Sequence, residues 1–221
     1  MISENLSKVK AKLPSDVQLV AVSKTKPNEA ILEAYEAGQR VFGENRVQEL
    51  IDKYEALPKD IEWHMIGNLQ SKKVRQIAPF VSLIHGVDSF KLLKEINKRA
   101  KNEDRIIDVL IQFHIAQEES KSGFTFDEAK EMLENEEFPS LGNIKVRGVM
   151  GMATFTDNKE QIQDEFRTLN NYFEIFKSHF FKFTEEFNIV SMGMSGDYEI
   201  AIEEGSNMVR IGSTIFGERN K

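Results

Sequence analysis

Short apolar runs alternate with amphipathic stretches along the whole chain, and this alternation predicts a repeated strand–helix unit. The first apolar run is Val17–Ser23, and a helical pattern follows it, beginning at Pro27 and ending at Gly38. Pro in the first turn and Gly after the last turn are typical of helix boundaries. The other predicted strands are Arg40–Gly43, Ile61–Ile66, Val81–His85, Arg105–Ile115, Ile144–Met152, Ile189–Met194 and Met208–Ile211.

The stretches between the later strands also have helical periodicity. One helix ends at Leu57, and the others span Gln70–Ile77, Phe90–Asn102, Phe126–Asn135, Lys159–Phe187 and Asp197–Glu204. Eight strand–helix alternations predict parallel βαβ units, and in a chain of this length they favour an α/β fold with a single (β/α)8 TIM-type barrel over residues 1–221. A doubly wound open sheet is the alternative. Within residues 1–13, Ser3–Lys12 predicts an extra helix outside the barrel.

Composition and charge exclude several classes of protein. The chain has 221 residues, no cysteine and a net charge of −7. Without cysteine there is no disulfide, catalytic thiolate or zinc–thiolate site. The acidic balance argues against a general nucleic-acid binder and against docking on anionic membranes. We expect a cytoplasmic protein, since the N-terminus lacks a signal-peptide pattern. The charged helices predict a monomer.

In a (β/α)8 barrel the functional residues lie at the carboxyl ends of the strands. Two clusters follow the last two strands: Met194, Ser195 and Gly196 follow the seventh, and Gly212, Ser213 and Thr214 follow the eighth. These two loops are the usual phosphate site of the fold, where backbone N–H groups and hydroxyls meet an anion. Turn and cap chemistry is the alternative interpretation of both clusters.

Lys24 ends the first strand, so its side chain is predicted to lie in the mouth of the barrel. A desolvated lysine attacks an aldehyde as the neutral amine. Lys26, next to Pro27, is expected to lie in a loop outside the mouth. A lysine combined with a phosphate site fits either a pyridoxal 5′-phosphate (PLP) protein or a Schiff-base aldolase that acts on a sugar phosphate.

Arg210, at the end of the eighth strand, favours the PLP interpretation. A guanidinium only donates hydrogen bonds, so it would keep a pyridine nitrogen unprotonated and weaken the ring as an electron sink. A salt bridge to Glu203, Glu204 or Glu218 is the alternative. His64 and His114 lie inside apolar strands, where core histidines are common, and no metal-binding spacing occurs, so we predict no metal site.

The chain resembles the PLP homeostasis protein family, whose barrel is similar to the N-terminal domain of alanine racemases. The resemblance covers nearly the whole chain. It rests on AVSKTKP (Ala21–Pro27), FGENRVQE (Phe42–Glu49), WHMIGNLQSKK (Trp63–Lys73), HGVDS (His85–Ser89), KSGF (Lys121–Phe124), RGVMGMA (Arg147–Ala153), MGMSGDYEIAI (Met192–Ile202) and GSNMVRIGSTIFGER (Gly205–Arg219).

This resemblance implies a PLP barrel of fold type III without the racemase C-terminal β-domain. It implies that Lys24 forms the Schiff base with the cofactor and that Arg210 faces the pyridine nitrogen. The phosphate would be held by Ser195, Gly212, Ser213 and Thr214, with Met194 beside them, and Asn45 and His64 would lie around the ring. Members of the family are PLP carriers or buffers without established turnover, with PLP-dependent apo-enzymes as candidate recipients.

Two features depart from the family pattern, and other functions stay open. Lys72 stands where the family often has Asn, and Gly151 replaces a bulkier residue between two methionines. Neither departure touches Lys24 or the predicted phosphate site. The alternatives are a weak PLP-dependent amino-acid racemase, a Schiff-base aldolase, and an interaction protein that uses the Phe-rich segment Phe173–Phe187 as its partner surface.

Overall fold

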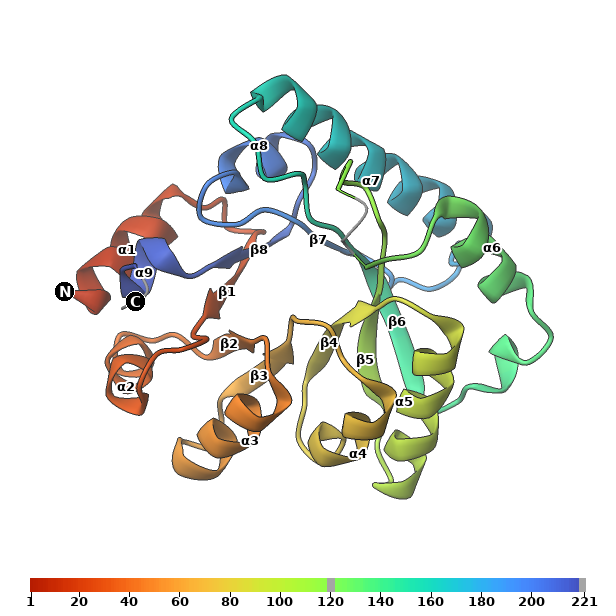
Figure 1. Cartoon of the computed structure of the whole chain (residues 1–221), viewed down its shortest axis with the longest axis horizontal. Coiled ribbons are helices and arrows are strands. Elements are labelled where there is room, and N and C mark those ends of the chain that lie inside the picture. The colour runs from red at the N-terminus through yellow and green to blue at the C-terminus, as the bar shows by residue number, and fades with distance from the viewer. Residues whose placement is uncertain (119–121, 219–221) are drawn as a thin grey trace.

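Eight parallel strands close into a barrel in which each strand pairs with the next in the sequence and β8 pairs with β1 (Figure 1). The computed structural model describes residues 1–118 and 122–218. The closed strand order confirms the predicted barrel and excludes the open doubly wound sheet. The strands are β1 (Gln18–Val22), β2 (Val41–Glu44), β3 (Glu62–Met65), β4 (Leu83–Val87), β5 (Ile107–Gln112), β6 (Ile144–Met150), β7 (Ile189–Ser191) and β8 (Met208–Ile211).

Helices follow the strands and surround the barrel (Figure 1). The first, α1 (Ile2–Lys12), precedes β1 and lies beside the last helix, where Asn5 Nδ2 donates to the Ile215 carbonyl at 3.2 Å. None of the helices in the described ranges combines the length and apolar character that crossing a membrane requires. The others are α2 (Asn28–Glu36), α3 (Val47–Ala56), α4 (Val74–Ile77), α5 (Phe90–Asn102), α6 (Phe126–Glu134), α7 (Lys159–His179), α8 (Tyr198–Glu203) and α9 (Ser213–Phe216), with 3₁₀ turns η1 (Ser71–Lys73) and η2 (Phe138–Ser140).

Two separate hydrophobic clusters stabilise this architecture. The larger lies between the strands and the surrounding helices, and its largest fully buried side chains include Trp63, Phe42 and Phe166. The smaller fills the inside of the barrel, as expected for a packed (β/α)8 interior. Its buried members come from six of the strands: Val20, Val41, Leu83, Leu110, Met150 and Met208. They form an apolar floor beneath the mouth.

Several boundaries differ from the sequence prediction for physical reasons. Helix α7 ends at His179 and not at Phe187. The chain then turns back, and Phe187 stacks on Phe181 and Phe173, with ring centroids 4.1 and 5.2 Å apart. Strand β4 begins at Leu83 because the Val81 N–H still donates to the Ile77 carbonyl at the exit of α4. Strands β5 to β7 stop earlier than predicted, since the residues beyond them form the mouth loops.

Candidate functional site

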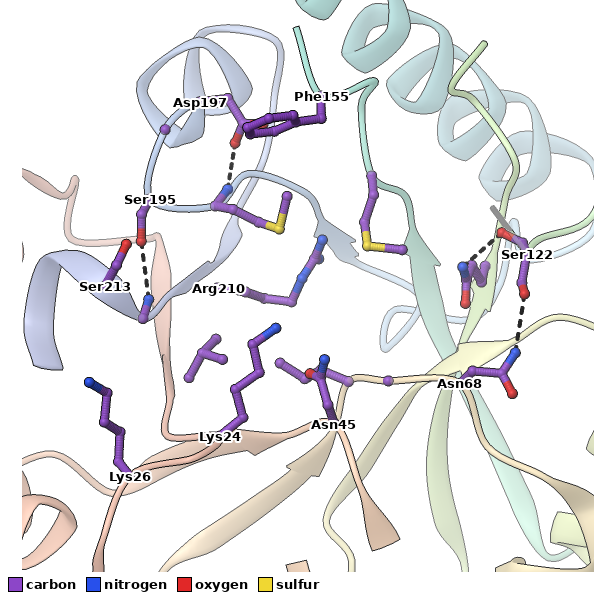
Figure 2. Close-up of a pocket in the computed structure, with 18 of the residues that line it drawn as sticks. Lys24, Lys26, Asn45, Asn68, Ser122, Phe155, Ser195, Asp197, Arg210 and Ser213 are labelled. Carbon is purple, nitrogen blue, oxygen red and sulfur yellow. Dashed lines mark hydrogen bonds between the residues drawn. The ribbon is translucent and has the colours of Figure 1, made fainter. Parts of the chain in front are cut away.

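A cavity of about 650 Å³ opens at the carboxyl ends of the strands (Figure 2). Three strands, β1, β5 and β8, contribute lining residues from their ends, and the other lining residues come from the segments that follow seven of the strands. The cavity brings together most of the residues singled out from the sequence: Lys24, Asn45, Met194, Ser195, Arg210, Gly212 and Ser213. Thr214 is exposed on α9 and His64 is buried below the mouth, and neither lines the cavity.

The loops after β7 and β8 meet at one end of the cavity. The Gly212 N–H donates to Ser195 Oγ at 3.2 Å, which joins the two loops (Figure 2). The first loop is closed on itself because the Met194 N–H donates to Asp197 Oδ1 at 2.6 Å. The hydroxyls of Ser195 and Ser213 therefore lie at the same end of the cavity, where they can donate hydrogen bonds to an anion.

A layer of buried polar side chains lies directly above the apolar floor of the barrel. Residues two apart on a strand share a face, and polar residues stand two positions after inward apolar ones: His85 after Leu83, Gln112 after Leu110 and Arg210 after Met208. Gln112 and Arg210 are about 5% and 4% exposed, and His85 is fully buried. Gln112 and Arg210 of this layer line the base of the cavity, whereas His85 lies outside its lining.

Arg210 is held by hydrogen bonds within this layer. Its Nη1 donates to Ser191 Oγ at 2.6 Å and its Nη2 donates to the Gly151 carbonyl at 3.0 Å. The guanidinium only donates, so Ser191 Oγ accepts from it, and the same oxygen lies 3.0 Å from His85 Nδ1. In the described part of the chain, Arg210 forms no ion pair with the glutamates considered from the sequence; Glu204 pairs with Arg167 instead.

The hydrogen-bond chain ends in two buried histidines. His85 Nε2 lies 3.0 Å from His64 Nδ1. Burial lowers the pKa of His64 to about 3. Burial, together with repulsion from a protonated His64 and from the Arg210 guanidinium, lowers the pKa of His85 well below its ordinary value. Both rings are therefore neutral at pH 7. Burial also lowers the pKa of Arg210 to about 10, which leaves the guanidinium charged.

The two lysines after β1 have different surroundings. Figure 2 shows Lys24 reaching into the cavity between Asn45 and Arg210. Lys26 lies at the edge of the cavity, which corrects its predicted place outside the mouth. Its Nζ donates to three carbonyls at the end of α9, those of Phe216, Gly217 and Glu218, at 2.9 to 3.1 Å. Lys26 therefore anchors the short helix that carries Ser213.

The opposite end of the cavity is lined by neutral polar groups. Asn68 Nδ2 donates to Ser122 Oγ at 3.1 Å, and Gln112 Nε2 donates to the Ser122 carbonyl at 2.8 Å. The backbone of Asn45 lies very close to Gly67. A Cβ added at position 67 would lie 2.4 Å from the Asn45 carbonyl oxygen. Glycine at position 67 thus lets the loops after β2 and β3 approach each other.

Sequence reasoning did not select several residues of the cavity. Gln112 left a signal, because it is a polar residue inside an otherwise apolar strand. Phe155, which is 95% exposed at the rim, left none, since loop residues carry no periodicity. Of the segments that carry the family resemblance, Lys121 and Arg219 lie outside the described residues.

Comparison with known proteins gives a consistent result along the whole chain. The family model described as alanine racemase, N-terminal domain, matches residues 1–220. A pyridoxal phosphate homeostasis protein of Aquifex aeolicus is 43% identical over 207 residues, which cover 91% of this chain and 87% of that protein. The structure of PipY of Synechococcus elongatus with PLP bound is 34% identical, with a TM-score of 0.88, and the match covers 98% of this chain and 100% of that chain.

An alanine racemase from E. faecalis shares the fold. Its TM-score is 0.74 at 18% identity, and the match covers 99% of this chain but 58% of the racemase. The barrel described here thus corresponds to one part of the longer racemase chain.

Proposed function

This chain belongs to the pyridoxal phosphate homeostasis proteins of the alanine racemase N-terminal domain family, and we propose that it binds PLP through Lys24 and carries the cofactor without turning over a substrate. The observation that carries the proposal is the convergence of a lysine, a buried arginine and two serine hydroxyls on one cavity. The PLP-bound PipY structure supports the same cofactor.

The residues of the cavity fit PLP in size and chemistry. A volume of about 650 Å³ lies within the range of sites for small ligands. Ser195 and Ser213, where the loops after β7 and β8 meet, would hold the phosphate. PLP supplies an aldehyde that condenses with an amine, and Lys24 is the amine that reaches into the cavity from β1 (Figure 2).

Arg210 would orient the ring by donating to its nitrogen. Two of the five guanidinium N–H groups donate to described residues, Ser191 and Gly151, so donors remain for a ligand. The fixed positive charge keeps a proton off the nitrogen that it faces. This arrangement supports binding of the ring and weakens the ring as an electron sink for carbanion chemistry.

The remaining lining residues also support a carrier. Two-sided proton transfer needs a second positioned acid or base, yet no tyrosine or histidine of the described residues lines the cavity. The lining carboxylate, Asp197, accepts the Met194 N–H.

We propose that PLP-dependent apo-enzymes receive the cofactor, and that the protein acts in the cytoplasm as a monomer.

Handover and turnover are tested together. The PLP-loaded protein is incubated with a PLP-dependent enzyme stripped of its cofactor, and separately with L-alanine in heavy water. We expect recovery of the stripped enzyme's activity and no α-proton exchange at a catalytic rate. Free PLP at the same concentration, with and without a scavenger for free PLP, serves as the control. Rapid exchange, or a stripped enzyme that stays inactive, would contradict a carrier.

A further inference from the structure

Lys24 lies in a tight turn whose backbone is conformationally disfavoured. The Lys26 N–H donates to the Ser23 carbonyl at 3.0 Å, so Ser23 to Lys26 form a four-residue turn with Lys24 in second place. Thr25, in third place, has a φ of 65°. Turns with a positive φ at this place favour glycine, and a β-branched residue there is rare. Something else must therefore hold the turn.

Three charged residues from β2 and α3 contact this turn, and none of them lines the cavity. Glu49 Oε1 accepts the Thr25 N–H. Lys53 Nζ donates to the Ser23 carbonyl at 2.8 Å, and Glu44 Oε1 accepts the Ser23 hydroxyl at 2.6 Å. The cluster of Glu44, Glu49 and Lys53, here called the turn clamp, thus grips the residues on both sides of Lys24.

The three residues of the turn clamp also form ion pairs with one another. Lys53 Nζ lies 2.7 Å from Glu44 Oε1 and 3.0 Å from Glu49 Oε1, so its three N–H groups are all used. Glu44 is fully buried and the Lys53 side chain is 6% exposed. Buried ion pairs of this kind contribute little net stability compared with apolar packing. A contribution to geometry explains their presence better than a contribution to stability.

We propose that the turn clamp is a positioning device for cofactor capture, in which Glu49 and Lys53 hold the strained turn so that Lys24 Nζ points into the cavity. The inference rests on the proposed function, since it assigns Lys24 as the amine that captures PLP. None of the three residues lines the cavity, so they act through Ser23 and Thr25: Glu49 and Lys53 bond to the backbone of the turn, and Glu44 bonds to the Ser23 hydroxyl.

The proposal is tested with Glu49, whose side chain is the most exposed of the three at 23%. Glu49→Ala should weaken PLP binding about tenfold, because a non-glycine residue in the left-handed region is unfavourable once its anchor is lost. The melting temperature of the PLP-free variant should stay close to that of the wild type. Affinity is measured from the visible absorbance of the full-length protein titrated with PLP.

A second substitution separates positioning from a general structural role. Thr25→Gly removes the penalty for a positive φ, so the Thr25→Gly/Glu49→Ala double variant should bind PLP within about threefold of Thr25→Gly alone. Glu49→Gln keeps a carbonyl oxygen to accept the Thr25 N–H and should bind nearly as tightly as the wild type. Gln48→Ala, which removes an exposed bond to Asp52 on the same helix, is the matched control.

The outcomes distinguish the two proposals. If Glu49→Ala binds PLP like the wild type, or if Thr25→Gly fails to restore binding, the turn clamp does not position Lys24, while PLP binding itself stands. If the wild type acquires no PLP on Lys24, the proposed function fails first, whatever the Glu49 variants do.

Discussion

The most informative single residues are the polar side chains inside the barrel. His64, His85, Ser191 and Arg210 form one hydrogen-bonded chain from the β3 strand to the base of the cavity. Arg210 is charged and only donates, so it is a fixed hydrogen-bond donor at one end of this chain. Burial keeps both histidines neutral, and neither of them lines the cavity.

These histidines should make stability depend on pH. The pKa of His64 is about 3 in the folded protein and the ordinary value is 6.5, so between these values the unfolded chain binds a proton that the folded chain does not. The contribution of His64 to the free energy of unfolding should therefore be fully present above about pH 6.5. It should decrease as the pH is lowered from 6.5 towards 3. In urea unfolding, His64→Gln should flatten the slope by up to about 1.4 kcal/mol per pH unit.

The matched control is His179→Gln, which removes an exposed histidine from the end of α7. It is expected to keep the slope of the wild type. An unchanged slope in His64→Gln would show that burial of this ring does not govern the acid sensitivity of the fold.

At the scale of elements, close contacts between neighbouring strands decide where each strand can lie. Gly148 on β6 has a φ of 152° and stands opposite Ile189 on β7. A Cβ at this position would lie 1.9 Å from the Ile189 carbonyl oxygen. Only glycine therefore permits the approach of β6 to β7, which places the Met194–Asp197 loop at the cavity.

Gly148→Ala should consequently lower the free energy of unfolding by at least about 3 kcal/mol, through steric overlap and backbone strain. Gly142→Ala, where an added Cβ meets nothing within 4 Å, is expected to stay within about 0.5 kcal/mol of the wild type. Denaturant unfolding measures both. Equal stability of the two variants would mean that the β6–β7 contact relaxes without cost.

The strands were predictable from the sequence, whereas some helix boundaries were not. Periodicity located all eight strands, because apolar runs report burial directly. The same periodicity predicted that the helix α7 continues to Phe187, because the aromatic residues beyond His179 have helical spacing. In the structure α7 ends at His179, and Phe181 and Phe187 stack on each other across a turn. The four-residue helix α9 was not predicted, since a segment this short carries too little periodicity to detect.

At the scale of the whole molecule, barrel closure turns separate strand ends into one site. Lys24 and Arg210 are far apart in the sequence, but β1 pairs with β8, with Val20 opposite Arg210. The rule that strand ends form the site was enough to select both residues. It did not predict the turn clamp or the histidine chain, because these depend on strand register and on side-chain direction, which only the closed barrel fixes.

The central claim is that Lys24 is the amine that holds PLP. Its most direct test is to load the protein with PLP, reduce it with borohydride and map the pyridoxyl group by peptide mass spectrometry. Lys24→Ala and Lys26→Ala are compared, since both lysines line the cavity. We predict the modification on Lys24 in the wild type and in Lys26→Ala, and its loss in Lys24→Ala. A wild-type protein that carries no pyridoxyl group, or carries it on another lysine, would contradict the account.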